Sequence, residues 1–563
     1  MPPIPNPPSS TPPVRGTTRL GLRRAATAPA DPAVSLITEP SADLADQPEP
    51  GSDVTPAEPA PVTAVQPGAA AVPSAIPRVP VLTGAVTRQP FWPKPARQAG
   101  RTVLLGCAAA GLTAAIALRP DRPGLGFLLT ALACAAAVLI AAKRLRPAGS
   151  RSVPRALWAA AALALTAVGV LRAADWLCWL CLLAALVAGS LAVAGERGER
   201  SVRGLLFGAF AVPLAALPAW PWLWRGVRAR RGTGRLVVSA LVGLGLLAVF
   251  GSLLAGADAA FAELLRGVLP AVDGGTSFRQ LVLFGLVGCG TAGACYLLVA
   301  RPTLTDPPVG QRSSVRRLEW AVPVGLLVLL FAAFVAVQLT VLFGGSSYVL
   351  RTANLTYAQY ARGGFWQLLA VTVLTLAVLA AAVRLAPRST SADRAWLRGL
   401  LGALAGLTLV VVLSALSRMW SYQQAYGFTV LRLVVEACEL WLGVVYLLVI
   451  AAGVRLRTSW LPGAVTAAAV AALLVLAVLD PERFIAERNV ARWQQTGAID
   501  LRYLGELSTD AVSALDRLPE PARNCVLTAI AERLGSAGDD DWRSWNNSRS
   551  AAQDTLAKAR VSC

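Results

Sequence analysis

The residues with the clearest potential for chemistry lie in one segment, Ser417–Leu448, which reads SRMWSYQQAYGFTVLRLVVEACELWLGVVYLL. Two arginines, Arg418 and Arg432, precede two glutamates, Glu436 and Glu439, in an apolar setting. Because residues three or four apart share a helical face, Arg432 and both glutamates can lie on one side of a helix. This pattern is typical of a structural ion pair, a proton relay or a binding site for a polar headgroup.

Glu436 is the residue that most requires an explanation. If the helix starts near Phe428, this carboxylate lies about 12 Å along the helix axis. An unpaired charge inside a membrane costs roughly 3 kcal/mol or more. We therefore expect Glu436 to pair with Arg432 or Arg418, to line a polar cavity, or to be protonated. A structural ion pair near the interface and a functional polar site are equally consistent with the sequence.

A second specific stretch, LTYAQYARGGFWQLLAV at Leu355–Val371, leads into a long apolar run. Its two tyrosines are three residues apart and share a helical face, and two glycines allow the chain to bend. Physical chemistry favours an interfacial elbow, with the tyrosines at headgroup level and the arginine on a lipid phosphate. The candidate residues of this elbow are Tyr357, Tyr360, Arg362, Gly363 and Gly364.

The sequence gives little support for a metal site, a redox site or a catalytic site. The chain has nine Cys and no His. Cys178 and Cys181 form CWLC inside an apolar run, where buried thiols are expected rather than a redox site. We predict no metal site, no cofactor and no catalytic residues, and we favour a protein that is not an enzyme. Cys525 and Cys563 lie in the polar tail and could pair in an oxidising compartment.

Composition identifies the class of protein. Of the 563 residues, 55% are hydrophobic and 15% are charged. The apolar residues form blocks of about 17–23, the length of a membrane-crossing helix. In a soluble protein, the net charge of +20 would suggest binding to nucleic acid. Here the arginines lie in short loops between apolar blocks, which indicates helix orientation and contact with anionic lipid, and no nucleic acid partner.

Three regions follow from this pattern. Residues 1–100 are rich in Pro and Ala and are expected to be a disordered arm, because they cannot bury enough apolar area to offset their ordering entropy. Residues 101–479 are expected to form an all-α polytopic bundle of eleven or twelve membrane helices, and residues 480–563 a small soluble helical domain. The eleven expected spans lie near Thr102–Leu118, Gly124–Ala142, Ala156–Leu171, Trp176–Ala194, Leu236–Ala255, Phe278–Ala300, Ala321–Phe343, Phe365–Leu385, Leu397–Leu416, Phe428–Val454 and Trp460–Leu479.

One further apolar block, Leu205–Trp224 (LLFGAFAVPLAALPAWPWLW), does not fit this series. It contains three prolines, which interrupt helical hydrogen bonding, and it has arginines on both flanks. We interpret it as re-entrant or interfacial. The basic loops then all fall on one side, which predicts a cytoplasmic N-terminus and an extracytoplasmic C-terminal tail. If the block does cross the membrane, the chain has twelve spans.

Several segments together resemble a known family. The stretches RRLEWAVPVGLLVLLFAAFVAVQLTVLFGG, LTYAQYARGGFWQLL, YQQAYGFTVLRL and DPERFIAERNVARWQQTGAIDLRYLGELSTDAVSALDRL occur in this order. From Leu236 to Trp545 the chain is similar to bacterial membrane proteins of the domain-of-unknown-function 4153/4173 group, and its Ala, Arg and Pro bias resembles actinobacterial proteins. The resemblance implies a multi-spanning membrane protein and assigns no reaction. It also implies that the elbow is a family hallmark.

Two hypotheses for function follow. The first is a non-enzymatic envelope sensor or scaffold that binds envelope or cytoplasmic proteins through residues 480–563 or 1–100. The second is a transporter or lipid-handling protein that uses a polar intramembrane site around Arg418, Arg432, Glu436 and Glu439. Both place the chain in the cell membrane as a multi-pass protein, with the lipid bilayer as its first partner.

Overall fold

The protein is described by a computed structural model that covers residues 91–145, 153–195, 201–228, 233–268, 274–302, 316–343, 365–536 and 541–558. Every regular element in these ranges is a helix, and none of them is a strand. The predicted all-α fold is therefore confirmed. Contacts divide the chain into two units, Met1–Gly84 and Ala85–Cys563, and all the described residues belong to the second unit. Most of the expected N-terminal arm lies outside the described residues.

The middle of the chain consists of long apolar helices, as the blocks of hydrophobic residues predict. They are α1 (Arg101–Ala117), α2 (Leu125–Leu145), α3 (Val153–Leu171), α4 (Asp175–Ala194), α5 (Val202–Arg228), α6 (Thr233–Ala257), α8 (Gly274–Val299), α9 (Arg317–Phe343), α12 (Phe365–Leu385), α13 (Ser391–Tyr426), α14 (Val430–Arg455) and α15 (Leu461–Leu479). A short helix, α7 (Ala259–Val268), follows α6.

Among the described residues, ten helices are long and apolar enough to cross a membrane. They are α2, α3, α4, α5, α8, α9, α12, α13, α14 and α15. Nine of them coincide with predicted spans, and the tenth, α5, contains the block Leu205–Trp224. α1 has 17 residues, and the apolar part of α6 is also shorter than the rest. The chain is therefore a multi-pass integral membrane protein.

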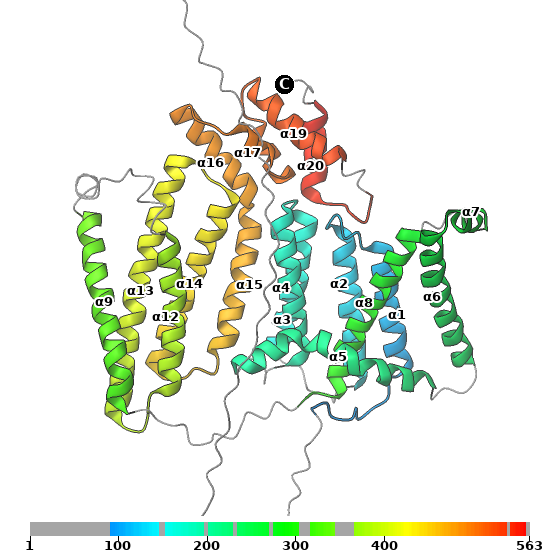
Figure 1. Cartoon of the computed structure of the whole chain (residues 1–563), viewed down its shortest axis with the longest axis horizontal. Coiled ribbons are helices and arrows are strands. Elements are labelled where there is room, and N and C mark those ends of the chain that lie inside the picture. The colour runs from blue at the N-terminus through cyan, green and yellow to red at the C-terminus, as the bar shows by residue number, and fades with distance from the viewer. Residues whose placement is uncertain are drawn as a thin grey trace, which may run out of the picture. The chain divides into compact units, whose positions relative to one another are not determined.

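Three hydrophobic cores hold these helices together. α9, α12, α13 and α14 share a core around the fully buried Leu404 and Tyr446. α1, α2, α5 and α8 share a second core around Trp222, and α3, α4 and α15 share a third around Leu165 and Leu177. Figure 1 shows most of these helices side by side with their long axes roughly parallel, whereas α5 runs across them.

α5 lies across one end of the bundle (Figure 1). A face of small, fully buried residues, Ala211, Ala215 and Ala219, packs in the core that includes the last turns of α8. At Gly293 of α8 an added Cβ would lie only 2.6 Å from the carbonyl oxygen of Val212. Glycine therefore permits the close crossing of α5 and α8. Although α5 is long enough to cross a membrane, these contacts lie at one end of its neighbours.

Three prolines lie inside α5, which is nevertheless one continuous helix: Pro213, Pro218 and Pro221. Ser190 of α4 donates its hydroxyl to Gly208 O at 2.6 Å and accepts from Val212 N at 3.1 Å. A neighbouring side chain thus adds hydrogen bonds in the turn that precedes Pro213, where proline removes a backbone donor. Within the described residues α5 does not turn back on itself.

A group of shorter helices follows α15, and we call it the C-terminal helices. They are α16 (Pro481–Thr496), α17 (Leu501–Gly505), the 3-10 turn η2 (Thr509–Ala511), α18 (Val512–Leu515), α19 (Ala522–Ser536) and α20 (Asn547–Lys558). They share a hydrophobic core around the buried Ile485, Leu515 and Leu527. Figure 1 shows them at the end of the bundle opposite to α5.

Candidate functional site

Three of the four predicted polar residues, Arg432, Glu436 and Glu439, lie on α14, which a tight turn joins to α13. α13 ends at Tyr426, and Gly427 follows with a φ of 83°, a left-handed conformation that favours glycine. Thr429 then caps α14, because its side chain accepts a hydrogen bond from the backbone N–H of Arg432. The sequence YGFT therefore forms a tight turn that packs the end of α13 against the start of α14.

Arg432 binds the end of α13 and the turn that follows it. Its guanidinium donates to the carbonyl oxygens of Tyr426, at 3.2 Å, and of Gly427. It also lies 4.5 Å from the centre of the Tyr422 ring. The carbonyls at a helix C-terminus carry partial negative charge, and aromatic faces attract cations. The positive charge of Arg432 is thus held by α13 and the turn.

Glu436 has a neutral partner. Its carboxylate accepts a hydrogen bond from Nε2 of Gln423 at 3.0 Å. Gln423 is 1% exposed, and its Oε1 has no hydrogen-bond partner in the part of the chain that the structure describes. Of the expected arrangements for Glu436, an ion pair with Arg432 or Arg418 is not found among the described contacts. Sequence reasoning missed Gln423, which stands in a polar loop-like stretch three residues before the end of α13.

Glu439 is the most deeply buried of the predicted residues, with 0% exposure. Neither of its carboxylate oxygens has a hydrogen-bond partner among the described residues. It shares a face of α14 with Glu436 and Gly443, which both meet α13. Glu436 bonds to Gln423, and a Cβ added to Gly443 would lie 3.7 Å from Val412. Glu439 is therefore enclosed at the seam between α13 and α14.

Arg418 makes a different contact. It donates to Oε1 of Gln338 on α9 at 2.8 Å, and the hydroxyl of Ser414 lies 3.3 Å from the same oxygen. Gln338 thereby joins α9 to α13. The structure brings Arg432 and Glu436 to the α13–α14 hairpin and places Arg418 at the contact between α9 and α13.

The predicted interfacial elbow lies outside the described residues. α12 begins at Phe365, directly after it. The elbow residues remain a prediction: Tyr357, Tyr360, Arg362, Gly363 and Gly364.

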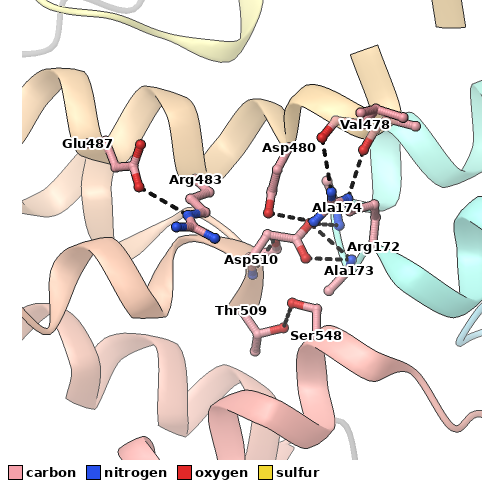
Figure 2. Close-up of polar contacts among 12 residues, drawn as sticks. Arg172, Ala173, Ala174, Val478, Asp480, Arg483, Glu487, Thr509, Asp510 and Ser548 are labelled. Carbon is pink, nitrogen blue, oxygen red and sulfur yellow. Dashed lines mark hydrogen bonds and ion pairs between the residues drawn. The ribbon is translucent and has the colours of Figure 1, made fainter. Parts of the chain in front are cut away.

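A second polar arrangement joins the C-terminal helices to the bundle, and sequence reasoning missed it (Figure 2). Asp510 is 5% exposed, and its carboxylate accepts hydrogen bonds from the backbone N–H groups of Ala173 and Ala174, each at 3.0 Å. These groups lie at the start of α4, where backbone N–H groups have no partner within the helix. Asp510 therefore caps a membrane helix that is more than 330 residues earlier in the chain.

An ion pair lies beside this cap (Figure 2). Arg172, after α3, pairs with Asp480 at 2.6 Å and donates to two carbonyl oxygens at the end of α15. Burial and then the charge of Asp510 raise the pKa of Asp480 to about 6, against the opposing effect of Arg172. Glu482 accepts from the indole N–H of Trp176 at 3.0 Å, and burial raises its pKa as well.

The C-terminal helices also bond to the ends of α3, α13 and α14. Asn546 donates its amide to two carbonyl oxygens at the end of α3, at 2.9 and 2.7 Å. Asn489 accepts from the backbone N–H of Phe428 at 2.9 Å and donates to its carbonyl at 2.8 Å. The Tyr503 hydroxyl accepts from Val430 N, the first residue of α14, at 2.8 Å.

The turn between α1 and α2 is bonded in the same way. The backbone N–H groups of Leu125 and Gly126, which start α2, donate to the carbonyls of Trp545 at 3.1 Å and Arg543 at 2.8 Å. Together with the previous contacts, the C-terminal helices and their connections satisfy backbone groups at three interhelical turns: α1–α2, α3–α4 and α13–α14. The sequence signal that could have suggested this is the polar DPERFIAERNVARWQ segment directly after the last apolar block.

Metals and cysteines add little to these two arrangements. Within the described ranges, no three His, Cys, Asp or Glu side chains are grouped so that they could hold a metal. Cys525 is disulfide-bonded, and its predicted partner, Cys563, lies outside the described residues.

Comparison with known proteins gives one match. A family model described as "Domain of unknown function (DUF4153)" matches residues 159–518. That range includes most of α3, all of α4 to α15 with the whole α13–α14 hairpin, and Asp510. No curated protein and no solved structure matches the chain.

Proposed function

The chain belongs to the DUF4153 family of membrane proteins, and from this premise we propose that it is a non-enzymatic envelope sensor or scaffold. In this proposal the C-terminal helices bind the signal or partner, and the membrane bundle responds. The observation that carries the proposal is the set of hydrogen bonds from these helices to the backbone at three interhelical turns. Because buried backbone groups require partners, displacing the C-terminal helices changes the ends of three pairs of membrane helices.

The strength of this coupling follows from the contacts. A helix cap stabilises a helix by about 0.5–2 kcal/mol, and a buried backbone group left without a partner costs about 1–3 kcal/mol. Three turns bonded in this way exceed the 1–3 kcal/mol that typical coupling between two sites requires. In this proposal, a ligand that displaces the C-terminal helices removes these bonds and so alters the ends of the membrane helices.

We propose that the C-terminal helices lie outside the cytoplasm. Basic residues gather at the other end of the bundle, next to the ends of α2, α12 and α14 and the starts of α9 and α13: Lys143, Arg144, Arg384, Arg394, Arg455, Arg316 and Arg317. Positively charged loops favour the cytoplasm, and disulfides such as that of Cys525 persist in oxidising compartments. A C-terminal reporter fusion that is active on only one face tests this orientation, and a cytoplasmic signal would overturn it.

A test of the sensor proposal uses the exposed tryptophans in the connection between α19 and α20. Trp542 is 51% exposed and Trp545 is 42% exposed, so both are available to a partner. We expect that Trp542→Ala with Trp545→Ala fails to complement cells that lack the protein under envelope stress, although the chain reaches the membrane. Trp460→Ala, at an exposed tryptophan on the opposite end of the bundle, is the matched control. Full complementation by the double variant would remove the support for sensing through this surface.

The second candidate function is a transporter or lipid-handling protein. The specific observation that favours it is the enclosed carboxylate of Glu439, next to Glu436 on α14. In this proposal the polar intramembrane site includes Glu436, Glu439 and Arg432, with Arg418 at the neighbouring α9 contact. Glu439→Gln discriminates between the two functions. A transport site loses function in this variant while the protein still folds, whereas the sensor keeps its function.

A further inference from the structure

We propose that Gln423, Glu436 and Glu439 form a binding site for a small monovalent cation, either a proton or a sodium ion. The site lies in the seam between α13 and α14. The inference concerns what this seam holds, and it does not require the protein to move the ion across the membrane or to act as a sensor.

The first argument is an inventory of donors and acceptors. The amide N–H₂ group of Gln423 is directed to Glu436 at 3.0 Å. The buried polar atoms that remain are Oε1 of Gln423 and both carboxylate oxygens of Glu439, and none has a hydrogen-bond partner within the described chain. All three are acceptors, since an ionised carboxylate and an amide oxygen carry no proton. Water, a proton or a cation can satisfy buried acceptors that lack protein donors, and a proton or a cation also neutralises the buried carboxylate charge.

The second argument is charge. Glu436 and Glu439 are three residues apart on one helical face, which places their Cβ atoms about 5–6 Å apart. Ionising both carboxylates on one helix face inside the bundle is unfavourable, because a low-dielectric interior solvates each charge poorly. One positive charge at Glu439 leaves a single carboxylate, which the amide of Gln423 already stabilises. Divalent metals in proteins usually recruit more oxygen ligands, and no group of three acidic, His or Cys side chains occurs among the described residues.

The third argument concerns the polar groups nearby. Arg432 donates to the carbonyls that end α13 and lies over the Tyr422 ring. Tyr446, two turns after Glu439 on α14, donates its hydroxyl to the carbonyl of Thr372 on α12 at 2.6 Å. Both side chains therefore have their own partners, and neither supplies a donor to Glu439.

The site lies near the end of the bundle that carries the C-terminal helices. Gln423 lies in the last turn of α13, next to carbonyls that accept hydrogen bonds from Arg492 of α16. Glu436 is half-buried between this end and Glu439. Glu439 lies nine residues after Val430, or roughly 14 Å into α14. The order from the end of the bundle inward is thus an amide, a half-buried carboxylate and a fully buried carboxylate, so the end that carries the C-terminal helices is the nearer one to the site.

The test uses the full-length protein in lipid nanodiscs and dicyclohexylcarbodiimide, an apolar reagent that modifies protonated carboxyl groups. Labelling of the peptide that contains Glu439 is followed by mass spectrometry over a range of pH, in sodium chloride or in choline chloride at equal ionic strength. Glu487 is the internal control, because it is a partly exposed carboxylate outside the membrane helices, paired with Arg483 at 3.0 Å. Glu439→Gln assigns the label, and the wild-type peptide mass does so even if this variant fails to fold.

The outcomes separate the two cations. If sodium binds, a concentration about ten times its Kd leaves about one-tenth of the sites free and slows labelling about tenfold relative to choline. If only the proton binds, labelling falls as pH rises and is the same in both salts. Under either outcome Gln423→Leu should change the sodium protection or the pH profile. Labelling of Glu439 no faster than that of Glu487 in choline at every pH would overturn the proposal.

Discussion

Replacing Asp510 with alanine should loosen the turn between α3 and α4 although Asp510 belongs to the C-terminal helices. The carboxylate accepts from two backbone N–H groups, those of Ala173 and Ala174, at 3.0 Å. Both Ala173 and Ala174 are buried, so water cannot readily replace the lost acceptor. The Asp510→Ala variant therefore leaves two donors without partners at the start of a membrane helix.

The magnitude follows from these contacts. Loss of a helix N-cap costs about 0.5–2 kcal/mol, and a buried donor left unsatisfied costs about 1–3 kcal/mol. We expect a local loss of about 2–4 kcal/mol, because the turn can relax in part. Each 1.4 kcal/mol changes an equilibrium tenfold, so amide exchange that occurs through local opening should accelerate by roughly 30- to 1000-fold.

Hydrogen exchange of the purified full-length protein, measured on the peptide from Arg172 to Leu177, is the assay. Asp500→Ala is the matched control, because Asp500 caps α17 through the backbone N–H of Tyr503 and makes no described contact with the bundle. Equal exchange of this peptide in wild type and Asp510→Ala would refute the reasoning that the C-terminal helices hold the membrane helices in place. Equal acceleration by the control would show that any destabilised C-terminal helix has this effect.

Three further perturbations test other contacts by thermal unfolding. Asp480→Asn should remove a pH dependence: the pKa of Asp480 rises from 3.8 to about 6 on folding, so the folded state binds the proton more tightly. Wild type should lose roughly 3 kcal/mol of stability as pH rises from about 3 to about 7, and parallel curves for the two proteins would contradict this. Gly427→Ala should cost about 1–3 kcal/mol more than Gly497→Ala. Both glycines have positive φ, but only at Gly427 does an added Cβ meet another residue, at 2.8 Å from Oδ1 of Asn489, so equal losses would refute the steric argument. Tyr446→Phe should cost about 0.5–1.5 kcal/mol, the net contribution of one hydrogen bond, because the hydroxyl is an additional donor to a carbonyl inside α12, and an unchanged melting temperature would count against that bond.

Much of the architecture could be predicted from the sequence. Nine predicted spans are long apolar helices, because a block of about 20 apolar residues must satisfy its backbone internally in lipid. The exceptional block Leu205–Trp224 was also recognised as different, from its prolines and flanking arginines. What the sequence left open was its path, and the close approach of α5 to α8 at Gly293 is a contact between distant segments.

The candidate site could be predicted only in part. Glu436 and Glu439 stand out because charged residues are rare inside apolar runs. Their partner on α13 did not stand out, because Gln423 is a neutral residue whose importance depends on its place opposite Glu436. Arg418 and Arg432 flank the same loop in sequence, yet one bonds to Gln338 on α9 and the other to the turn at Gly427. Sequence proximity therefore overestimated how closely these four charges gather.

The sequence by itself determined the class of the protein, the positions of most membrane helices and the location of the unusual intramembrane carboxylates. These features depend on local hydrophobicity and on the types of single residues. Only the tertiary structure decided that Asp510, Asn546 and Asn489 complete the hydrogen bonding of membrane helices, and that Glu439 is enclosed with unpartnered oxygens. A backbone group at a helix end needs a partner, but which distant side chain supplies it depends on how the whole chain packs.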